Sequence, residues 1–376
     1  MSNTKANSFR FASIDPYIER NMVQPTETLI SSKNMVEWGD GNCFPDYIQD
    51  LFDECPTLHS IINGNVDYTA GDRVQIASFR PDYRDGQMNN KGDNIAAQVR
   101  DIAYDRWKFG GFALQVIRNL VGGIAEVYYM PVRYLRANKE AIVFYYCEDW
   151  AKRGRKDVIV YPAFMANLDW AKLSDEERNR HASSILFVKA DNGSTYPQSP
   201  FRAALKACEM ERMIDDFHIS DLNNHFTASA IVNFNNGEAD DETKEQIEND
   251  FAEKFGGVKN GGRIAFSWNP NKESATDIQE FEMKDFGERY KSLSTWVRQQ
   301  IFASFRAIPL LFGLTSEANT GFSTDEFEQS YKLYARTMIR PVQRQICDAY
   351  DKIFGGTGVM TITPFSIAGE TEQEVN

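Results

Sequence analysis

The sequence of 376 residues lacks the features that mark several large classes of protein. No apolar run approaches 18 residues, so no transmembrane helix is expected. The N-terminal residues are polar and the C-terminus carries no lipidation or retention motif, so we expect neither a secretory signal nor a lipid anchor. The sequence therefore predicts a protein that has no membrane partner.

Cysteine and histidine are both scarce. The five cysteines form an odd set without a C-x-x-C pair, and the four histidines are scattered along the chain. A disulfide framework, a structural zinc site and a histidine-rich metal centre are therefore not expected, and a reducing compartment fits better. We expect no metal and no cofactor.

The motifs of common enzymes are absent as well. The sequence contains no G-x-x-x-x-G-K-[ST] loop, no G-x-S-x-G elbow and no H-E-x-x-H helix, and no G-x-G-x-x-G follows a predicted strand. Residues 256–263 are rich in glycine, but they lead into a predicted strand, whereas a phosphate cradle needs a helix N-terminus after the loop. The sequence predicts that this protein is not an enzyme.

One short segment is an exception. Asp40–Phe44 (DGNCF) resembles the nucleophile motif of ovarian-tumour-type cysteine proteases, in which a cysteine, here Cys43, lies at a helix N-terminus. His225 is the candidate base, since an aromatic residue follows it. Pro45 departs from that family's pattern, and His225 falls at the end of a predicted helix rather than on a strand. The alternative is a turn followed by a helix whose first turn accepts Pro45.

What the sequence does contain is typical of a folded globular protein. Hydrophobic residues make up 42%, charged residues 25% and aromatic residues 13%, and the length favours two or three packed units. The net charge is −13, which disfavours tight binding to DNA phosphates. This charge does not conflict with a protein that lets DNA slide past without gripping it.

Residues 45–190 have the pattern of one α+β domain, preceded by a polar arm over residues 1–34. Helical patterns cover 45–62, 93–109 and 163–182, and strand-like runs cover 112–120, 124–130, 141–147, 158–161 and 184–189. Pro56 interrupts the first helical pattern, and Gly110 with Gly111 ends the second.

The second half of the chain is built around long helices. Ser199 and Pro200 give a helix start, and the pattern continues to about Phe226, roughly 40 Å at 1.5 Å per residue. Pro341 lies inside the last helical pattern, so we expect a kink there. In chain order we expect a strand over 228–234, a helix over 240–255, a strand over 263–268, helices over 287–306 and 323–354, and a strand-like tail over 359–364.

Several short motifs follow one another in an order that is similar to one family. They are Trp38–Ile48, Cys55–Ile62 with Ala70 and Gly71, Gly110–Ala113, Met130–Arg136, Tyr196–Phe201 and Phe305–Gly313. Together they resemble the portal proteins of tailed double-stranded DNA bacteriophages, over about residues 35–355. Pro197 departs from the family, which has glycine there. The chain after Phe354 is short, so we expect a helical crown to be reduced or missing.

This resemblance implies an α+β fold that assembles as a ring, commonly of twelve subunits. The implied parts are an N-terminal arm (1–44), a wing (45–199), a first stem helix (200–226), a strand–helix–strand clip (227–283), a second stem helix (284–306), a tunnel loop (307–322) and a kinked long helix with a reduced tail (323–376) that returns to the wing.

The resemblance also implies a structural function without covalent chemistry. A portal ring forms a channel at one capsid vertex, through which DNA is packaged and ejected. The implied partners are further copies of the chain, the terminase large subunit, the major capsid protein, a head-to-tail adaptor or connector, and double-stranded DNA that passes non-specifically. The implied location is the virion, after assembly in the cytoplasm of a host bacterium. Another ring-forming head-to-tail adaptor is an alternative, which the long helix 200–226 with its insert disfavours.

Apolar residues concentrate in the tunnel loop. Exposed apolar loops usually mark contacts, so in a ring these residues would pack against neighbouring loops or border the DNA. A loop folded onto its own core is the alternative. The tunnel-loop candidates are Pro309, Leu310, Leu311, Phe312, Leu314 and Phe322.

Charge is distributed unevenly over the implied parts of the chain. Residues 227–283 hold 12 acidic and 5 basic residues, whereas residues 287–306 hold 4 basic residues and 1 acidic residue. An acidic channel wall repels phosphates and a limited basic band steers DNA; solvated faces or salt bridges are the alternative. The DNA-channel candidates are Arg289, Lys291, Arg298 and Arg306, and the candidates for contact with the packaging motor or an adaptor are Glu242, Glu245 and Glu248.

Overall fold

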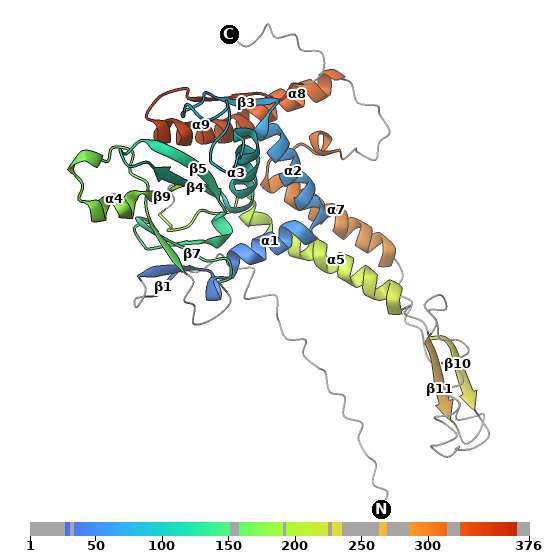
Figure 1. Ribbon diagram of the computed structural model, residues 1–376. Coiled ribbons are helices and arrows are strands. Elements are labelled where there is room, and N and C mark those ends of the chain that lie inside the picture. The colour runs from blue at the N-terminus through green and yellow to red at the C-terminus, as the bar shows by residue number, and fades with distance from the viewer. Residues whose placement is uncertain are drawn as a thin grey trace, which may run out of the picture. The chain divides into compact units, whose positions relative to one another are not determined.

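The structure is a computed structural model that describes residues 27–30, 34–150, 158–190, 193–224, 228–234, 263–268, 286–313 and 324–366 (Figure 1). The chain divides into two units. Unit 1 contains Met1–Lys206 and Gln300–Asn376, and unit 2 contains Ala207–Gln299. Helices alternate with strands in the described residues, which agrees with the predicted α+β class.

Four helices form the centre of unit 1. They are α1 (Phe44–Glu54), α2 (Pro56–Ala70), α3 (Ile95–Phe109) and α9 (Arg340–Phe354). Helix α2 contacts the other three, and its Leu58, Ile61 and Ile62 are fully buried. Pro56 occupies the first turn of α2, where a missing N–H leaves no hydrogen bond unmade. The interruption predicted at Pro56 therefore separates two helices.

The described strands of unit 1 form three antiparallel sheets. One has the order β5-β4-β9, one has the order β1-β2-β6-β7-β8, and the third pairs β3 with β12. The last pairing fixes a C-terminal strand beside a segment from the N-terminal half. The strands are β1 (Glu27–Ile30), β2 (Met35–Trp38), β3 (Arg73–Ile76), β4 (Gly111–Arg118), β5 (Ile124–Met130), β6 (Leu135–Ala137), β7 (Val143–Tyr146), β8 (Ile159–Pro162), β9 (Ser183–Lys189) and β12 (Met360–Thr363).

Short helices connect several of these elements. The 3-10 helices are η1 (Asp40–Asn42), η2 (Val132–Tyr134), η3 (Trp170–Lys172), η4 (Arg202–Ala204) and η6 (Pro309–Phe312), and α4 (Asp175–His181) is a short α-helix. The single helix predicted over 163–182 is wrong. Phe164 donates its backbone N–H to Ile185 on β9 at 2.8 Å, and α4 begins only after Ser174, which forms a capping box with Glu177.

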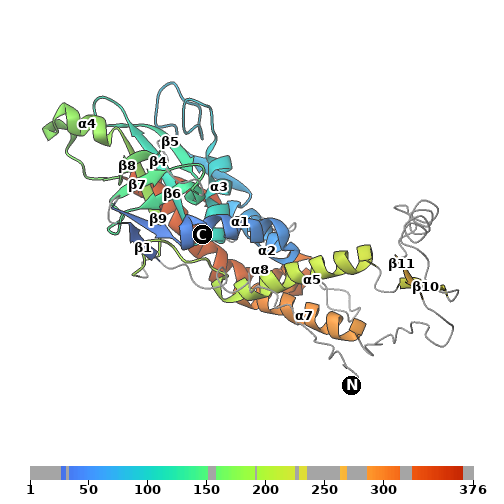
Figure 2. The same ribbon diagram turned by 90° about the horizontal axis from the view of Figure 1, so that it is seen from below.

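Two long helices carry the chain between the units. Helix α5 (Leu205–Asn224) begins in unit 1 and continues into unit 2, and α7 (Phe286–Ser304) runs from unit 2 into unit 1 (Figures 1 and 2). The last helical region consists of α8 (Thr324–Tyr334), the π-helix η7 (Ala335–Ile339) and α9. The π-helix ends two residues before Pro341, which has no N–H to donate to the preceding turn. The kink predicted at Pro341 stays a prediction, and the helix is irregular in the turn before this proline.

Unit 2 contains two strands with the predicted bounds, β10 (Ala228–Phe234) and β11 (Arg263–Trp268). The two strands pair in parallel, a geometry that a tight hairpin cannot join and that requires a crossover connection. The helix predicted over 240–255 falls in that connection and lies outside the described residues.

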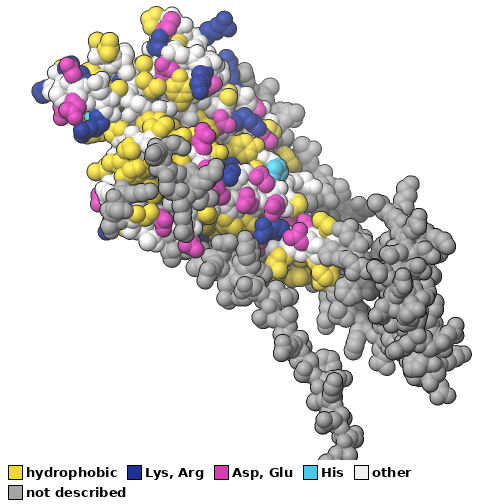
Figure 3. Space-filling view, turned by 60° about the horizontal axis from the view of Figure 1, so that its bottom comes forward, with side chains coloured by type: hydrophobic (Ala, Val, Ile, Leu, Met, Phe, Trp, Pro, Cys, Tyr) yellow, Lys and Arg dark blue, Asp and Glu magenta, His cyan; other side chains and the backbone are white. Residues whose placement is uncertain are grey.

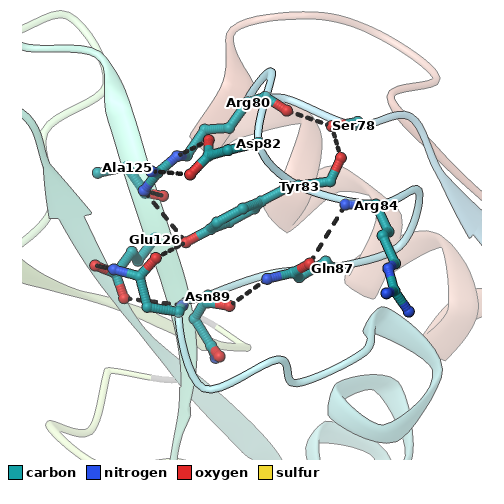
Figure 4. A network of polar contacts seen from close by, with 10 residues as sticks. Ser78, Arg80, Asp82, Tyr83, Arg84, Gln87, Asn89, Ala125 and Glu126 are labelled. Atoms are coloured by element: carbon teal, nitrogen blue, oxygen red, sulfur yellow. Dashed lines mark hydrogen bonds and ion pairs between the residues drawn. The ribbon is translucent and has the colours of Figure 1, made fainter.

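The loop between β3 and α3 is fastened to β5 by a polar network (Figure 4). Arg80 donates two hydrogen bonds to the Asp82 carboxylate, at 2.9 and 2.6 Å, and one to the Tyr83 hydroxyl at 3.3 Å. Tyr83 donates to Asn90 at 2.9 Å, and Asn90 donates to Glu126 on β5 at 2.7 Å. Because each polar group has a partner in this chain, the network explains how a turn-rich loop is held in place.

Candidate functional site

A buried arginine lies at the centre of the site. Arg136, on β6, is fully buried, and its guanidinium donates to backbone oxygens of Arg133 at 2.9 Å, Leu135 at 2.7 Å and Asn42 at 2.6 Å. It also donates to the side-chain oxygen of Asn42 at 2.9 Å. Burial lowers the pKa of Arg136 to about 10, which still leaves it charged at neutral pH. Arg136 therefore ties the chain around Asn42 to the sheet.

Asn42 accepts these hydrogen bonds from an uncommon backbone conformation. Its φ angle is +66°, in the left-handed region where asparagine is tolerated better than most residues. Its side-chain oxygen also accepts a hydrogen bond from the backbone N–H of Trp38 at 2.9 Å. The glycines around it, Gly39 and Gly41, have positive φ angles too. The turn predicted before α1 thus places Asn42 against Arg136.

Tyr196 brings in a third segment of sequence. The Trp38 and Tyr196 rings are stacked, with centroids 4.5 Å apart and planes at 3°. The Tyr196 hydroxyl donates to the Val36 carbonyl and accepts from the Ala137 N–H, and burial raises the pKa of Tyr196. We call Trp38, Asn42, Arg136 and Tyr196 the anchor site. Three motifs that resemble portal proteins, 38–48, 130–136 and 196–201, meet there.

The double glycine of a fourth motif lies against the segment that follows Tyr196. A Cβ atom on Gly110, whose φ angle is +88°, would lie 2.0 Å from the Gln198 carbonyl oxygen. A Cβ atom on Gly111 would lie 2.7 Å from the carbonyl oxygen of Val188. Only glycine allows this close passage. The chain is therefore held at residues 196–198, just before the first long helix.

Within unit 1, the ends of the two long helices meet. We call residues 201–206 and 300–306 the helix roots. Phe201 and Phe305 are fully buried and stack with centroids 5.4 Å apart. Phe305 also lies 6.5 Å from the ring of Trp107 on α3, which donates its indole N–H to Thr69 on α2 at 3.0 Å. Phe305 is therefore packed against α3, and Phe201 is packed against Phe305.

Within unit 2, the two helices also lie side by side (Figures 1 and 2). The rings of Phe217 on α5 and Tyr290 on α7 stack with centroids 5.2 Å apart and planes at 9°. Val297 on α7 is fully buried. In chain order, this pair of helices flanks the parallel strands β10 and β11.

The apolar residues of the predicted tunnel loop divide into two groups. In η6, Leu311 is buried and its carbonyl accepts a hydrogen bond from the Tyr68 hydroxyl at 2.6 Å. The Phe312 ring lies over Gly64, where a Cβ atom would approach it to 2.7 Å. These two residues therefore pack on the core of their own chain, which is the alternative that the sequence left open. Pro309 is exposed and Leu310 is half-buried, whereas Leu314 and Phe322 lie outside the described residues.

The predicted charged residues are not gathered into one site. Lys291 and Arg298 are exposed and lie two turns apart on one face of α7. Arg306 is exposed and follows α7 with a φ angle of +50°. The side chain of Arg289 lies outside the described residues, as do Glu242, Glu245 and Glu248. On the face shown in Figure 3, described acidic, basic and hydrophobic side chains are interspersed.

The described surroundings of Cys43 are not those of a catalytic nucleophile. It is exposed at the start of α1, and its thiol donates to the Gly41 carbonyl at 3.4 Å. Partial burial and the nearby Asp46 carboxylate raise the pKa of Cys43, whereas a nucleophile needs a lowered pKa. His225, the candidate base, lies outside the described residues. This environment argues against the cysteine protease alternative.

A scan against protein-family models gives no match, and a search of curated proteins gives none either. A comparison with solved structures does find chains of similar fold. A chain in the virion of a native gene transfer agent particle aligns with a TM-score of 0.55 at 15% identity, covering 85% of this chain and 82% of that one. A chain in the neck of the native particle, computed with C12 symmetry, aligns with a TM-score of 0.54 at 14% identity, covering 85% and 83%.

A further similar chain belongs to an HK97 family phage portal protein from Corynebacterium diphtheriae. It aligns with a TM-score of 0.44 at 10% identity, covering 81% of this chain and 88% of that one, and the fold assignment does not depend on it. The likenesses show the fold, and the resemblance to phage portal proteins is confirmed at that level. In the part of the chain that the structure describes, no helix is both long and apolar enough to cross a membrane.

Proposed function

We propose that this chain is a portal protein, the subunit of a ring that forms a DNA channel at one vertex of a capsid. The observation that carries the proposal is the likeness in fold to chains of a gene transfer agent virion and neck, which extends over 85% of this chain. The meeting of three portal-like motifs at the anchor site supports it, because the motifs then have a common structural purpose.

In this proposal the two units have different tasks. Residues 45–199 form the wing, α5 and α7 form the stem, and residues 227–283 form the clip. In this proposal the anchor site and the helix roots hold the ends of the stem helices firmly on unit 1. A channel subunit needs this rigidity because its neighbours must all present the same surface.

The proposed channel holds DNA weakly. Lys291 and Arg298 are exposed on one face of α7, where they would steer phosphates, and the net charge of −13 disfavours tight binding. Sequence reading is not required for passage, because contacts to phosphates carry no sequence information. The proposed location is the virion, and the proposed partners are the capsid protein, the terminase large subunit and a head-to-tail adaptor.

The first test is the mass and shape of the purified full-length chain, measured by light scattering and negative-stain imaging. A ring of about a dozen subunits with a central hole is expected. A stable monomer or dimer at high concentration, in the presence of capsid protein, would contradict the proposal. A ring that binds a tail-side partner but no terminase would favour the alternative, a head-to-tail adaptor.

The second test concerns the clip. Replacing Glu242, Glu245 and Glu248 by lysine reverses the charge of the proposed motor contact. We expect rings of normal size and a packaging rate in a terminase-driven assay that falls about tenfold, which corresponds to 1.4 kcal/mol. Lysine replacement of Glu140, Glu148 and Glu176 in unit 1 is the control. Equal packaging rates in both variants would show that these clip residues do not contact the motor.

A further inference from the structure

A small cavity lies beside the anchor site in unit 1. Its volume is about 70 Å³, several times the roughly 10–15 Å³ that one water molecule needs. Apolar side chains of Trp38, Phe44, Tyr196 and Leu205 form part of its wall. Glu27, Ser199 and Arg202 are among its polar lining residues. The cavity is therefore large enough for a small polar group.

Two lining residues carry buried polar atoms without a partner. Trp38 and Ser199 are 1% and 4% exposed, and neither the Trp38 indole nitrogen nor the Ser199 hydroxyl has a hydrogen-bond partner among the described residues. A buried donor without an acceptor costs about 1–3 kcal/mol. Because both residues line one cavity, an occupant with acceptor oxygens is a candidate partner for the two atoms.

The missing hydrogen-bond acceptor is particular to Trp38, because three other tryptophans have one. The indole N–H of Trp107 donates to Thr69 at 3.0 Å, that of Trp150 donates to the Tyr134 carbonyl at 3.0 Å, and that of Trp170 donates to the Leu120 carbonyl at 2.9 Å. The described part of the chain thus supplies acceptors to these three indoles and none to Trp38, the ring at the centre of the anchor site.

Two residues that line the cavity, Glu27 and Arg202, carry opposite charges. The Glu27 carboxylate accepts hydrogen bonds from the backbone N–H groups of Thr195 and Tyr196, both at 2.9 Å, which offset part of its charge. Arg202 is exposed and forms no ion pair with another described residue. An indole N–H, a hydroxyl and a guanidinium together match the acceptor oxygens of a carboxylate.

We propose that this cavity receives a carboxylate side chain from a second copy of this chain, with Arg202 as its ion-pair partner. The inference rests on the proposed ring, in which each copy has a neighbour. A copy with 54 acidic and 41 basic residues offers carboxylates in excess, so an exposed arginine that lines the cavity is complementary to it. The contact would link each subunit to the next at the start of α5.

A cross-linking experiment tests this. Rings are assembled from an equal mixture of unlabelled and ¹⁵N-labelled Arg202→Lys chains, and a carbodiimide couples the introduced lysine to any carboxylate in contact with it. We expect cross-linked peptides in which one partner is light and the other heavy, a signal that only coupling between copies produces. Arg84→Lys, at another exposed arginine, is the control and should give no such peptide.

The outcomes separate this inference from the proposed function. If the chain forms no ring, the proposed function fails first. If rings form and the lysine introduced at position 202 couples to Glu27, to residues 1–26 of its own copy or to nothing, the inference alone is overturned. Arg202→Glu should also raise the subunit concentration at half-assembly about tenfold or more, whereas Arg84→Glu should not. Equal assembly by the two variants would overturn the inference as well.

Discussion

The helix roots in unit 1 and the continuation of the same helices in unit 2 are held in different ways. Phe201 and Phe305 at the roots are fully buried, whereas Met213, Ile219 and Trp296 in unit 2 are 44%, 57% and 48% exposed. The roots are thus stabilised inside one chain, and the unit 2 helices leave apolar surface exposed among the described residues. Contiguous exposed apolar surface marks contacts with partners, and we expect such a contact on these helices. Changes at the roots should therefore affect folding, and changes in unit 2 should affect assembly.

The largest effect on folding is expected at the anchor site. Replacing Arg136 by methionine keeps much of the volume but removes four donated hydrogen bonds, three of them to backbone carbonyls. Each buried acceptor left without a donor costs about 1–3 kcal/mol, so the free energy of unfolding should fall by about 4 kcal/mol or more. Urea denaturation followed by circular dichroism measures it. Arg84→Met, at an exposed arginine, should cost little, and similar losses in both variants would contradict this account of Arg136.

A matched pair of substitutions tests the comparison directly. Phe305→Ala removes a buried ring at a root and should lower the free energy of unfolding by about 3–5 kcal/mol. Trp296→Ser removes a half-exposed ring in unit 2 and should change it by less than about 1 kcal/mol, while weakening ring assembly. Denaturation and light scattering on the same samples separate the two readouts. A Trp296→Ser chain that assembles normally would show that this apolar surface is not a subunit contact.

Much of the local structure could be predicted from the sequence. The strands β5, β10 and β11 have the predicted bounds, and α3, α5 and α7 begin and end within a few residues of their patterns, because hydrophobic periodicity and helix caps are local signals. The helix predicted over 163–182 failed because Ser174 and its capping box override a weak apolar period.

The anchor site could not be predicted, for a physical reason. Arg136 is separated from Asn42 by 94 residues, and no local pattern indicates that an arginine will be satisfied by carbonyl oxygens instead of a carboxylate. Likewise, the sequence around Leu311 and Phe312 has the pattern of an exposed apolar loop. In the structure, Leu311 accepts a hydrogen bond from Tyr68 and the Phe312 ring lies over Gly64. The motifs indicated which segments resemble portal proteins, but only the tertiary structure shows that these segments contact one another.

A buried carboxylic acid gives unit 1 a pH dependence. Asp105 on α3 is 2% exposed, accepts from the Val132 N–H at 2.8 Å, and has its pKa raised by burial from 3.8 to about 6. The folded state therefore binds more protons than the unfolded state between about pH 4 and pH 6. The contribution of Asp105 to the free energy of unfolding falls as the pH rises through this window, by about 3 kcal/mol at 1.36 kcal/mol per pKa unit.

Asp105→Asn should remove this contribution. The amide oxygen can still accept from Val132, so the variant should match the unchanged chain near pH 4 and exceed its free energy of unfolding by up to about 3 kcal/mol at pH 7.5. Urea denaturation at the two pH values measures the difference. Asp40→Asn, on the exposed turn before α1, is the control. A constant difference at both pH values would show that Asp105 is not protonated in this range.

The smallest effect is expected at Arg306, where two substitutions distinguish the role of its backbone conformation from the role of its charge. Arg306 ends α7 in the left-handed conformation, with its N–H bonded to the Ala303 carbonyl and the next N–H bonded to the Phe302 carbonyl, an arrangement in which glycine is usual. Arg306→Gly should raise the free energy of unfolding by about 1 kcal/mol, because it removes left-handed strain, whereas Arg306→Ala should not. Both variants remove the same charge, so a role of Arg306 in the DNA channel predicts equal effects on packaging. Unequal packaging that follows stability would instead assign Arg306 to the helix end alone.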